Sequence, residues 1–266
     1  MIMGILNATP DSFSDGGRYL DRDAAVAHGL QMAAEGADIL DVGGESTRPR
    51  AAPVPEAEEC ARVLPVIQAL RRRSGALISI DTYKAEVARR AIDAGADLVN
   101  DVTGLSADGH MAAVVGQAGV PLVLMHMRGT PETMADLPPS PDVLADIEEG
   151  WRQGLARAAA AGVAAEKVIL DPGLGFGKNA AENLLILNRL GRLLAFGRPL
   201  LVGASRKRFI GAVLDQPVEQ RLMGSVAAAA AAVLRGAHVV RVHDVGATRA
   251  AVRLLDAIAT ERVDPC

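Results

Sequence analysis

One pattern recurs along this chain and limits the folds open to it: a helix-like stretch, then a glycine, then a short apolar run. Clear copies lie at residues 34–40, 93–99 and 234–240, and looser copies follow Gly119 and Gly162. Glycine just past a helix accepts the left-handed conformation that ends the helix. The repeating unit is therefore a helix followed directly by a strand, which is the alternation of an α/β protein.

Eight apolar runs are candidate strands: residues 2–7, 38–43, 77–81, 98–101, 122–126, 168–171, 200–203 and 239–243. They are continuous rather than alternating, as expected for strands buried on both faces. Helices are expected between them, among others at residues 21–36, 56–72, 85–95, 143–162, 182–196 and 221–236. This order predicts a (β/α)8 TIM barrel in one domain, residues 1–266. A doubly wound sheet is the weaker alternative, because no strand is followed by a GxGxxG turn.

The composition fits this fold class and disfavours several kinds of partner. Half of the residues are apolar but only 3% are aromatic, so the core must be built from Ala, Val, Leu and Ile. A formal charge of −4 does not favour nucleic acid as a partner. The longest apolar run is too short to cross a membrane, and the N-terminus does not resemble a signal peptide. Cys60 and Cys266 make neither a disulfide framework nor a zinc spacing, so we expect a cytoplasmic protein.

Polar residues gather where the predicted strands end. In a parallel barrel these ends meet at one mouth, where barrel enzymes place their catalytic residues. For any single residue, helix capping is the alternative. Chance is a poor explanation for the whole set, which comprises Asn7, Asp81, Asn100, Asp101, His126, Asp171, Ser205, Arg241 and His243.

The residue types at this mouth suit an anionic heterocycle. Asp81, Asn100 and Asp171 are suited to the edge of a flat, nitrogen-rich ring, because a carboxylate makes two parallel hydrogen bonds to an amino-pyrimidine. A lone histidine is more simply a core residue, but His243 shares a strand face with Arg241. Two cations on one strand face require an anion. The cations that suit a phosphate or diphosphate are Arg48, Lys207, Arg241 and His243.

Two polar loops follow the first two strands at the same mouth. Residues 7–17 combine turn formers, hydroxyls, carboxylates and an aromatic ring, which indicates a mobile lid. Residues 43–50 add hydroxyls and guanidiniums. Asn7 is a candidate ligand for Mg²⁺ together with diphosphate oxygens.

A glycine run at residues 173–178 invites comparison with nucleotide-binding loops. It ends in Gly-Lys, but Pro172 and Asn179 stand where a Walker A motif requires Gly and then Ser or Thr. The spacing is not GxGxxG either. We interpret these glycines as allowing a ligand close to the backbone, with Phe176 lining it. Since no Ser-His-Asp, Cys-His or zinc arrangement is evident, transfer from a phosphate-linked substrate is the predicted reaction class.

Taken in order, these segments resemble the motifs of the bacterial dihydropteroate synthases of folate synthesis. The similar segments are residues 3–7, 9–17, 43–49, 79–82, 100–101, 125–127, 171–173, 205–207 and 241–244, and they span essentially the whole chain. The resemblance implies the barrel, a homodimer and one reaction. In that reaction 6-hydroxymethyl-7,8-dihydropterin diphosphate condenses with p-aminobenzoate to give 7,8-dihydropteroate and pyrophosphate.

The resemblance also implies roles for individual residues. The pterin would contact Asp81, Asn100, Asp171 and Lys207, with Phe176 and Met125 nearby. The diphosphate would contact Asn7, Thr47, Arg48, Arg241 and His243, with Mg²⁺ at Asn7 and at Asp11 or Asp15. The p-aminobenzoate would lie against Phe13, Thr47 and Pro49. The implied catalytic residues are Asp81, Lys207, Arg241 and His243.

The chain departs from the commonest pattern of these enzymes at two positions. Arg50 stands where Gly usually follows Pro in the second loop. Arg208 stands where Ser usually follows Ser-Arg-Lys, at the implied site for the carboxylate of p-aminobenzoate, and it bears on sulfonamide sensitivity. Two alternatives remain open: a pterin-dependent methyltransferase of the same barrel type, which would not need the cations, and a non-catalytic pterin-binding paralogue.

Overall fold

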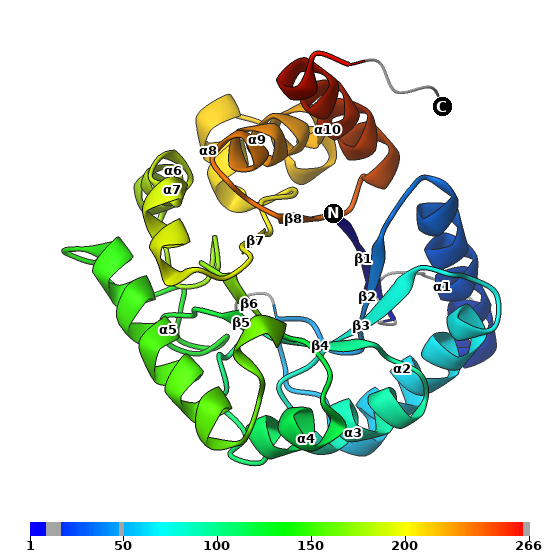
Figure 1. Ribbon diagram of the computed structural model, residues 1–266. Helices are drawn as coiled ribbons and strands as arrows, with labels where there is room; N and C mark the ends of the chain where they lie inside the picture. Colours follow the sequence, from blue (N-terminus) through cyan, green and yellow to red (C-terminus); the bar gives the residue numbers. More distant parts are fainter. Residues whose placement is uncertain (9–16, 48–50, 263–266) are drawn as a thin grey trace.

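The eight apolar runs form one parallel sheet that closes into a barrel (Figure 1). The computed structural model describes residues 1–8, 17–47 and 51–262. The strands are β1 Ile2–Asn7, β2 Ile39–Gly43, β3 Leu77–Asp81, β4 Leu98–Asp101, β5 Leu122–Met125, β6 Val168–Asp171, β7 Leu201–Val202 and β8 Val239–Val242. β8 pairs with both β1 and β7, and a bridge between Leu170 and Leu200 links β6 to the start of β7. The predicted (β/α)8 barrel is confirmed.

A ring of helices surrounds the strands (Figure 1). They are α1 Gly17–Ala34, α2 Glu56–Arg71, α3 Ala85–Asp93, α4 Met111–Ala118, α5 Val143–Ala160, α6 Ala180–Asn188, α7 Leu190–Leu193, α8 Arg208–Leu214, α9 Leu222–Leu234 and α10 Val245–Thr260, with short 3-10 turns η2 Ala165–Lys167, η3 Leu194–Phe196 and η4 Val218–Gln220. The single helix predicted at residues 182–196 is wrong. It divides into α6, α7 and η3 because Arg189 leaves helical geometry, with φ −106° and ψ 18°. In the described ranges no helix has the length and apolar character that crossing a membrane requires.

The glycines of the recurring pattern end their helices as predicted. Gly36, Gly95 and Gly236 have φ values of 96°, 112° and 98°. In each copy, the amide after the glycine donates to the carbonyl five residues earlier, at 2.9, 2.9 and 3.0 Å. The next amide then donates to a carbonyl of, or just before, a neighbouring strand. This repeated helix ending directs each chain segment straight into the barrel.

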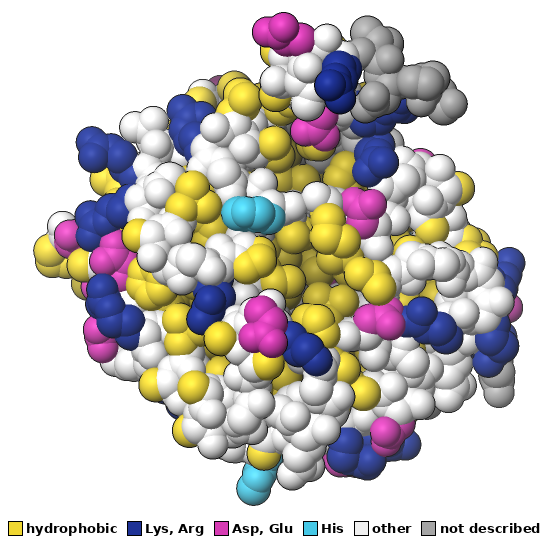
Figure 2. Space-filling view, viewed as in Figure 1, with side chains coloured by type: hydrophobic (Ala, Val, Ile, Leu, Met, Phe, Trp, Pro, Cys, Tyr) yellow, Lys and Arg dark blue, Asp and Glu magenta, His cyan; other side chains and the backbone are white. Residues whose placement is uncertain are grey.

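Both faces of the strands are buried. Outward-facing residues such as Leu6, Leu40 and Ile80 pack with the helices in the main core. Inward-facing residues near the starts of the strands form a second cluster inside the barrel, comprising Met3, Ile39, Leu98, Val123, Leu201 and Val239. Along the barrel axis, hydrophobic side chains gather in the hollow at the centre of the molecule (Figure 2). Polar side chains are thus confined to the later part of the barrel strands.

Replacement of Ile39 by alanine tests this internal layer. Ile39 is 2% exposed, and its register partner Leu77 on the next strand is 41% exposed. We expect Ile39→Ala to lower the free energy of unfolding by about 2–5 kcal/mol, because it opens a cavity inside the barrel. Leu77→Ala is the matched control and should cost about 0.5 kcal/mol or less. Urea unfolding measures both, and equal losses would contradict a packed layer inside the barrel.

Candidate active site

A network of charged and polar side chains crosses the barrel above its apolar layer. Arg241 on β8 donates from Nε to Asp41 Oδ2 on β2, at 2.6 Å. It also donates from Nη2 to Asp81 Oδ2 on β3, at 2.6 Å. Asn100 on β4 donates to the same Asp41 oxygen at 3.1 Å. One guanidinium therefore ties β8 to β2 and β3, across the intervening strand β1.

Asp41 completes this network, although no sequence motif pointed to it. It is fully buried and lies inside β2 rather than at its end. The sequence did contain one signal for Asp41: an aspartate inside a buried apolar run must have a partner. Asp41 Oδ1 and Asp81 Oδ1 are both buried without a hydrogen-bond partner in the described part of the chain. Each carboxylate thus keeps one oxygen available as an acceptor.

The electrostatics of this network keep Arg241 protonated and move the pKa of Asp81 towards neutral pH. Burial raises the pKa of the Asp81 carboxyl to about 7, while Arg241 opposes this shift and Asp41 adds to it. Burial alone would lower the pKa of Arg241, but Asp41 and Asp81 together raise it above its ordinary value. Asp81 can therefore act as either an acceptor or a donor near neutral pH.

A second cluster lies at the ends of β6 and β7. Asp171 Oδ1 accepts a hydrogen bond from the Gly173 amide at 2.7 Å. The Lys207 ammonium donates to the Leu174 carbonyl and lies 4.5 Å from the centre of the Phe176 ring. Burial raises the pKa of Asp171 and lowers that of Lys207 to about 8, and each group opposes the shift of the other. The predicted residues Asp171, Phe176 and Lys207 thus share one surface.

The glycine run shapes this surface through its backbone. Gly173, Gly175 and Gly177 have positive φ values of 65°, 80° and 66°. A Cβ on Gly173 would lie 2.0 Å from the His126 carbonyl oxygen, so only glycine fits there. The close approach that requires glycine at this point is between two parts of the chain itself. Met125 ends β5 in register with Asp171 and is 3% exposed.

The remaining predicted residues stand at or near the mouth. Asn7 ends β1 in register with Gly43, and Thr47 is half-buried in the loop that follows β2. His243 Nδ1 lies 2.9 Å from Ser205 Oγ, and the His243 amide donates to the same oxygen. Arg208 begins α8 and is exposed. Several predicted residues lie outside the described ones, namely Asp11, Phe13, Asp15, Arg48, Pro49 and Arg50.

Two polar residues at strand ends have structural roles instead. Asp101 accepts hydrogen bonds from the amides of Thr103 and Leu105, at 2.8 and 2.9 Å, so it holds the loop that follows β4 rather than capping a helix. The His126 ring packs against Gly150 on α5, where a Cβ would lie 2.6 Å from its Cδ2. Burial lowers the pKa of His126 to about 2, so this ring is neutral.

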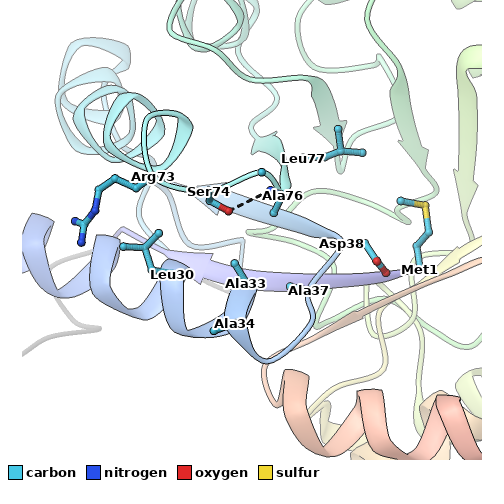
Figure 3. Close-up of a pocket in the computed structure, with 11 residues that line it drawn as sticks. Met1, Leu30, Ala33, Ala34, Ala37, Asp38, Arg73, Ser74, Ala76 and Leu77 are labelled. Atoms are coloured by element: carbon cyan, nitrogen blue, oxygen red, sulfur yellow. Dashed lines mark hydrogen bonds between the residues drawn. The ribbon is translucent and has the colours of Figure 1, made fainter. Parts of the chain in front are cut away.

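A groove of about 690 Å³ lies at the opposite end of the barrel, beside α1 and the start of β3 (Figure 3). Two of its polar side chains are already bonded to local backbone. Asp38 accepts from the Ile2 amide at 2.6 Å, and Ser74 accepts from the Ala76 amide at 3.1 Å. Because no set of acids, bases and cations converges there, the mouth formed by the strand ends is the candidate active site.

The Asp81 pKa predicts a specific pH dependence of stability. Between the unfolded pKa of about 4 and the native value, the native state binds a proton that the unfolded state has lost. Wild-type stability relative to Asp81→Asn should therefore fall as the pH rises from about 4 to about 7, by up to roughly 1.4 kcal/mol per pH unit. Urea unfolding of both proteins across this range tests the assignment. Parallel curves would exclude Asp81 as the titrating group.

Comparisons with known proteins identify the family of this chain. The model of the family described as "Pterin binding enzyme" matches residues 3–243. The dihydropteroate synthase of Escherichia coli strain K12 is 48% identical over 256 residues, which cover 96% of this chain and 90% of that protein. These matches include every strand of the barrel.

Two solved structures share both fold and sequence with this chain. Dihydropteroate synthase from Xanthomonas albilineans, solved with 4-aminobenzoic acid, has a TM-score of 0.92 and 46% identity, covering 99% of this chain and 93% of that one. The Yersinia pestis enzyme, solved with a sulfonamide drug complex, has a TM-score of 0.92 and 46% identity, covering 97% and 94%. Because the family model, the sequence and the fold all match, this chain belongs to the dihydropteroate synthases, a group of pterin-binding enzymes.

Proposed function

We propose that this protein works in the cytoplasm as a dihydropteroate synthase. It condenses 6-hydroxymethyl-7,8-dihydropterin diphosphate with p-aminobenzoate and releases pyrophosphate. The observation that carries this proposal is that acceptors for a nitrogen-rich ring and cations for a diphosphate lie at the same mouth of the barrel. Acceptors for a nitrogen-rich ring, the half-buried Asp81 and the buried Asp171, lie with the cations Lys207 and Arg241 within one barrel. The similarity to a synthase solved with 4-aminobenzoic acid supports it.

The pterin side of the site is assigned to Asp81, Asn100, Asp171 and Lys207. Asp171 uses Oδ1 for the Gly173 amide, which leaves Oδ2 for the amino-pyrimidine edge of the pterin. Asn100 supplies both a donor and an acceptor for the ring. Phe176 and Met125 supply apolar contacts beside it. Because Asn100 and Asp171 are buried and Asp81 and Lys207 are half-buried, their hydrogen bonds to a pterin are made in place of bonds to water.

The diphosphate side is assigned to Asn7, Thr47, Arg241 and His243, with Arg48 from outside the described residues. Arg241 uses Nε and one N–H of Nη2 for Asp41 and Asp81, so Nη1 and the second N–H of Nη2 are left to meet phosphate oxygens. These cations stabilise the negative charge that grows on the departing pyrophosphate. The two aspartates hold the guanidinium in place before the substrate arrives.

The chemistry needs no covalent intermediate on the protein. The bond between the pterin methylene carbon and the diphosphate oxygen breaks, and its electron pair leaves with pyrophosphate. The electron-rich pterin ring stabilises the cationic methylene, and the neutral arylamine nitrogen of p-aminobenzoate attacks it. The amine then loses one proton. Phe13, Thr47 and Pro49 are the residues assigned to the aminobenzoate pocket, which excludes water from the cation.

Mg²⁺ is the cofactor that we assign to this reaction. The described residues contain no group of three or more His, Cys, Asp or Glu side chains that could hold a metal. A substrate-borne Mg²⁺ fits this mouth better than a protein cage, because Mg²⁺ keeps several waters and pairs few protein oxygens with substrate phosphates. The Asn7 side chain at the end of β1 is the described oxygen ligand that we assign to it. Once bound, Mg²⁺ would neutralise charge on the leaving diphosphate.

Product analysis tests the proposed function. Purified protein with the pterin diphosphate, p-aminobenzoate and Mg²⁺ should form pyrophosphate and dihydropteroate in equal amounts. Chelation of Mg²⁺ should abolish both products. Binding of the pterin diphosphate without either product would favour the non-catalytic paralogue, and methyl transfer would favour the methyltransferase.

Asp171→Ala tests the pterin assignment. We expect this change to weaken binding of the free pterin alcohol by about 2–4 kcal/mol, because it leaves a buried hydrogen-bonding edge unpaired. Asp101→Asn is the matched control, since Asp101 ends a strand but caps its own loop. The control should lower the melting temperature and leave pterin affinity unchanged. Calorimetry that finds equal pterin affinity in Asp171→Ala and wild type would remove Asp171 from the site.

Arg208→Ala tests the departure from the commonest family pattern. If the Arg208 guanidinium meets the carboxylate of p-aminobenzoate, its charge-assisted hydrogen bond is worth about 1.5–3 kcal/mol. The KM for p-aminobenzoate should then rise about tenfold or more, while pterin affinity stays the same. A steady-state titration of p-aminobenzoate at saturating pterin diphosphate measures this change. An unchanged KM would mean that the exposed side chain stays in solvent.

We also assign a homodimer to this protein, formed through α8, η4 and α9. Large exposed hydrophobic side chains gather on these elements, including Val213 at 58% and Met223 at 74% exposure. An apolar surface of this kind marks an interface. Val213→Glu with Met223→Glu should give monomers in analytical ultracentrifugation. Leu254→Glu on α10, which is 63% exposed, is the control that should stay dimeric. A wild-type monomer would refute the assignment.

A further inference from the structure

Lys178 ends the glycine run and is buried, with 8% of its surface exposed. Its ammonium donates to three backbone carbonyls: His126 at 3.1 Å, Gly173 at 2.9 Å and Phe176 at 3.1 Å. An ammonium has three donors, so every one of them is used. In the described part of the chain no carboxylate forms an ion pair with it. Burying such a charge is costly, and here three peptide carbonyls offset that cost, with Asp171 and Glu182 contributing without forming ion pairs.

These three carbonyls come from two separate segments, the end of β5 and the glycine run. Their oxygens converge on one point and would repel one another without a cation between them. The loop is held a second time by Asn183 on α6, whose Oδ1 accepts from the Gly175 amide at 2.7 Å. Asn183 also donates to the Lys178 carbonyl at 3.1 Å. The ammonium and the amide together define the path of residues 173–178.

This path decides where two contacts of Lys207 lie. The Leu174 carbonyl accepts from Lys207, and the Phe176 ring lies 4.5 Å from its ammonium. Leu174 follows one carbonyl that Lys178 holds, and Phe176 supplies another. If the glycine run changed shape, Lys207 would lose both contacts without any direct change to its own side chain.

We propose that Lys178 is a positioning residue for the pterin side of the active site. Its ammonium holds residues 173–178 in the shape that presents the Leu174 carbonyl and the Phe176 ring to Lys207. It acts through these groups and does not itself contact the substrate. The inference rests on the proposed function, because it takes Lys207 and Phe176 as pterin contacts.

The charge state of Lys178 is sensitive to this arrangement. Burial lowers the pKa of Lys178 to about 7, with Asp171 opposing the shift. Loss of the proton would remove one of the three donors and turn a lone pair toward a carbonyl. The other titratable or charged groups around Lys178 are Lys207, Arg128, Glu182 and His126. If the protonated form supports pterin binding, then binding must in turn raise the pKa of Lys178, because the coupling is reciprocal.

Lys178→Met tests the proposal, because methionine keeps the length of the side chain but has no donor. Lys167→Met is the matched control: Lys167 donates to the Gly119 carbonyl at the other end of β6. Calorimetry with the uncharged pterin alcohol should show binding at least tenfold weaker in Lys178→Met and unchanged in Lys167→Met. The KM of Lys178→Met for p-aminobenzoate should stay within about twofold of wild type.

Three results of this experiment would contradict the positioning role, each for a different reason. Wild-type protein that does not bind the pterin alcohol would overturn the proposed function, and the positioning role with it. Equal pterin affinity in wild type and Lys178→Met would overturn the positioning role alone. A parallel loss of pterin affinity and rise in the KM for p-aminobenzoate would make Lys178 a general support of the fold and overturn it too.

A measurement on wild-type protein decides the matter if Lys178→Met does not fold. The chain has four lysines, Lys84, Lys167, Lys178 and Lys207, so ¹³Cε labelling of lysine gives four signals. Arginine variants of the other three assign the signal of Lys178. Saturation with the uncharged pterin alcohol should raise the pKa of Lys178 and leave that of Lys167 unchanged. An unchanged Lys178 pKa would overturn the proposal.

Discussion

The double contact of Arg241 with Asp41 and Asp81 is the interaction on which the active site depends. Asp41 is fully buried, and the side chains of Asp81 and Arg241 are only 10% and 20% exposed. Such charges are each costly alone, and removing one partner from a buried set costs about 3–5 kcal/mol. Together they form a rigid crossing of the barrel from β8 to β2 and β3. A site arranged in this way needs little rearrangement when a charged substrate enters, because its charges are already oriented by one another.

The position of the charged groups along the strands follows from where the barrel interior is apolar. An apolar layer closes the interior at the starts of the strands, so charged groups can be buried only toward their ends. There the chain binds the cationic side chains of Arg241 and Lys178 in two different ways. Arg241 is held by carboxylates, whereas Lys178 is held by peptide carbonyls of the glycine run. The first orients groups directly, and the second orients them through the backbone, which is why glycine is required at position 173.

Most of the fold could be predicted because its signals are local. A helix that ends in glycine, followed by a continuous apolar run, specifies a strand buried on both faces, and strands such as β3 and β6 begin and end where they were predicted. The break between α6 and α7 at Arg189 could not be predicted. The stretch at residues 182–196 has apolar helical character, and the break is a backbone change at one residue. In the candidate site, Asp81 and Asp171 could be predicted because they end strands, and Asn100 because it lies one residue before the end of β4.

By itself, the sequence determined the order of helices and strands, the single mouth at which polar residues gather, and the chemical classes that meet there. Only the tertiary structure decided which polar residues face one another. Asp41 and Asp101 are both buried aspartates of barrel strands. One of them bonds Arg241 on another strand, whereas the other caps its own loop. The reason is physical: a strand's pattern fixes which residues are buried, but partners 200 positions apart in sequence, as Arg241 and Asp41 are, meet only when the sheet closes.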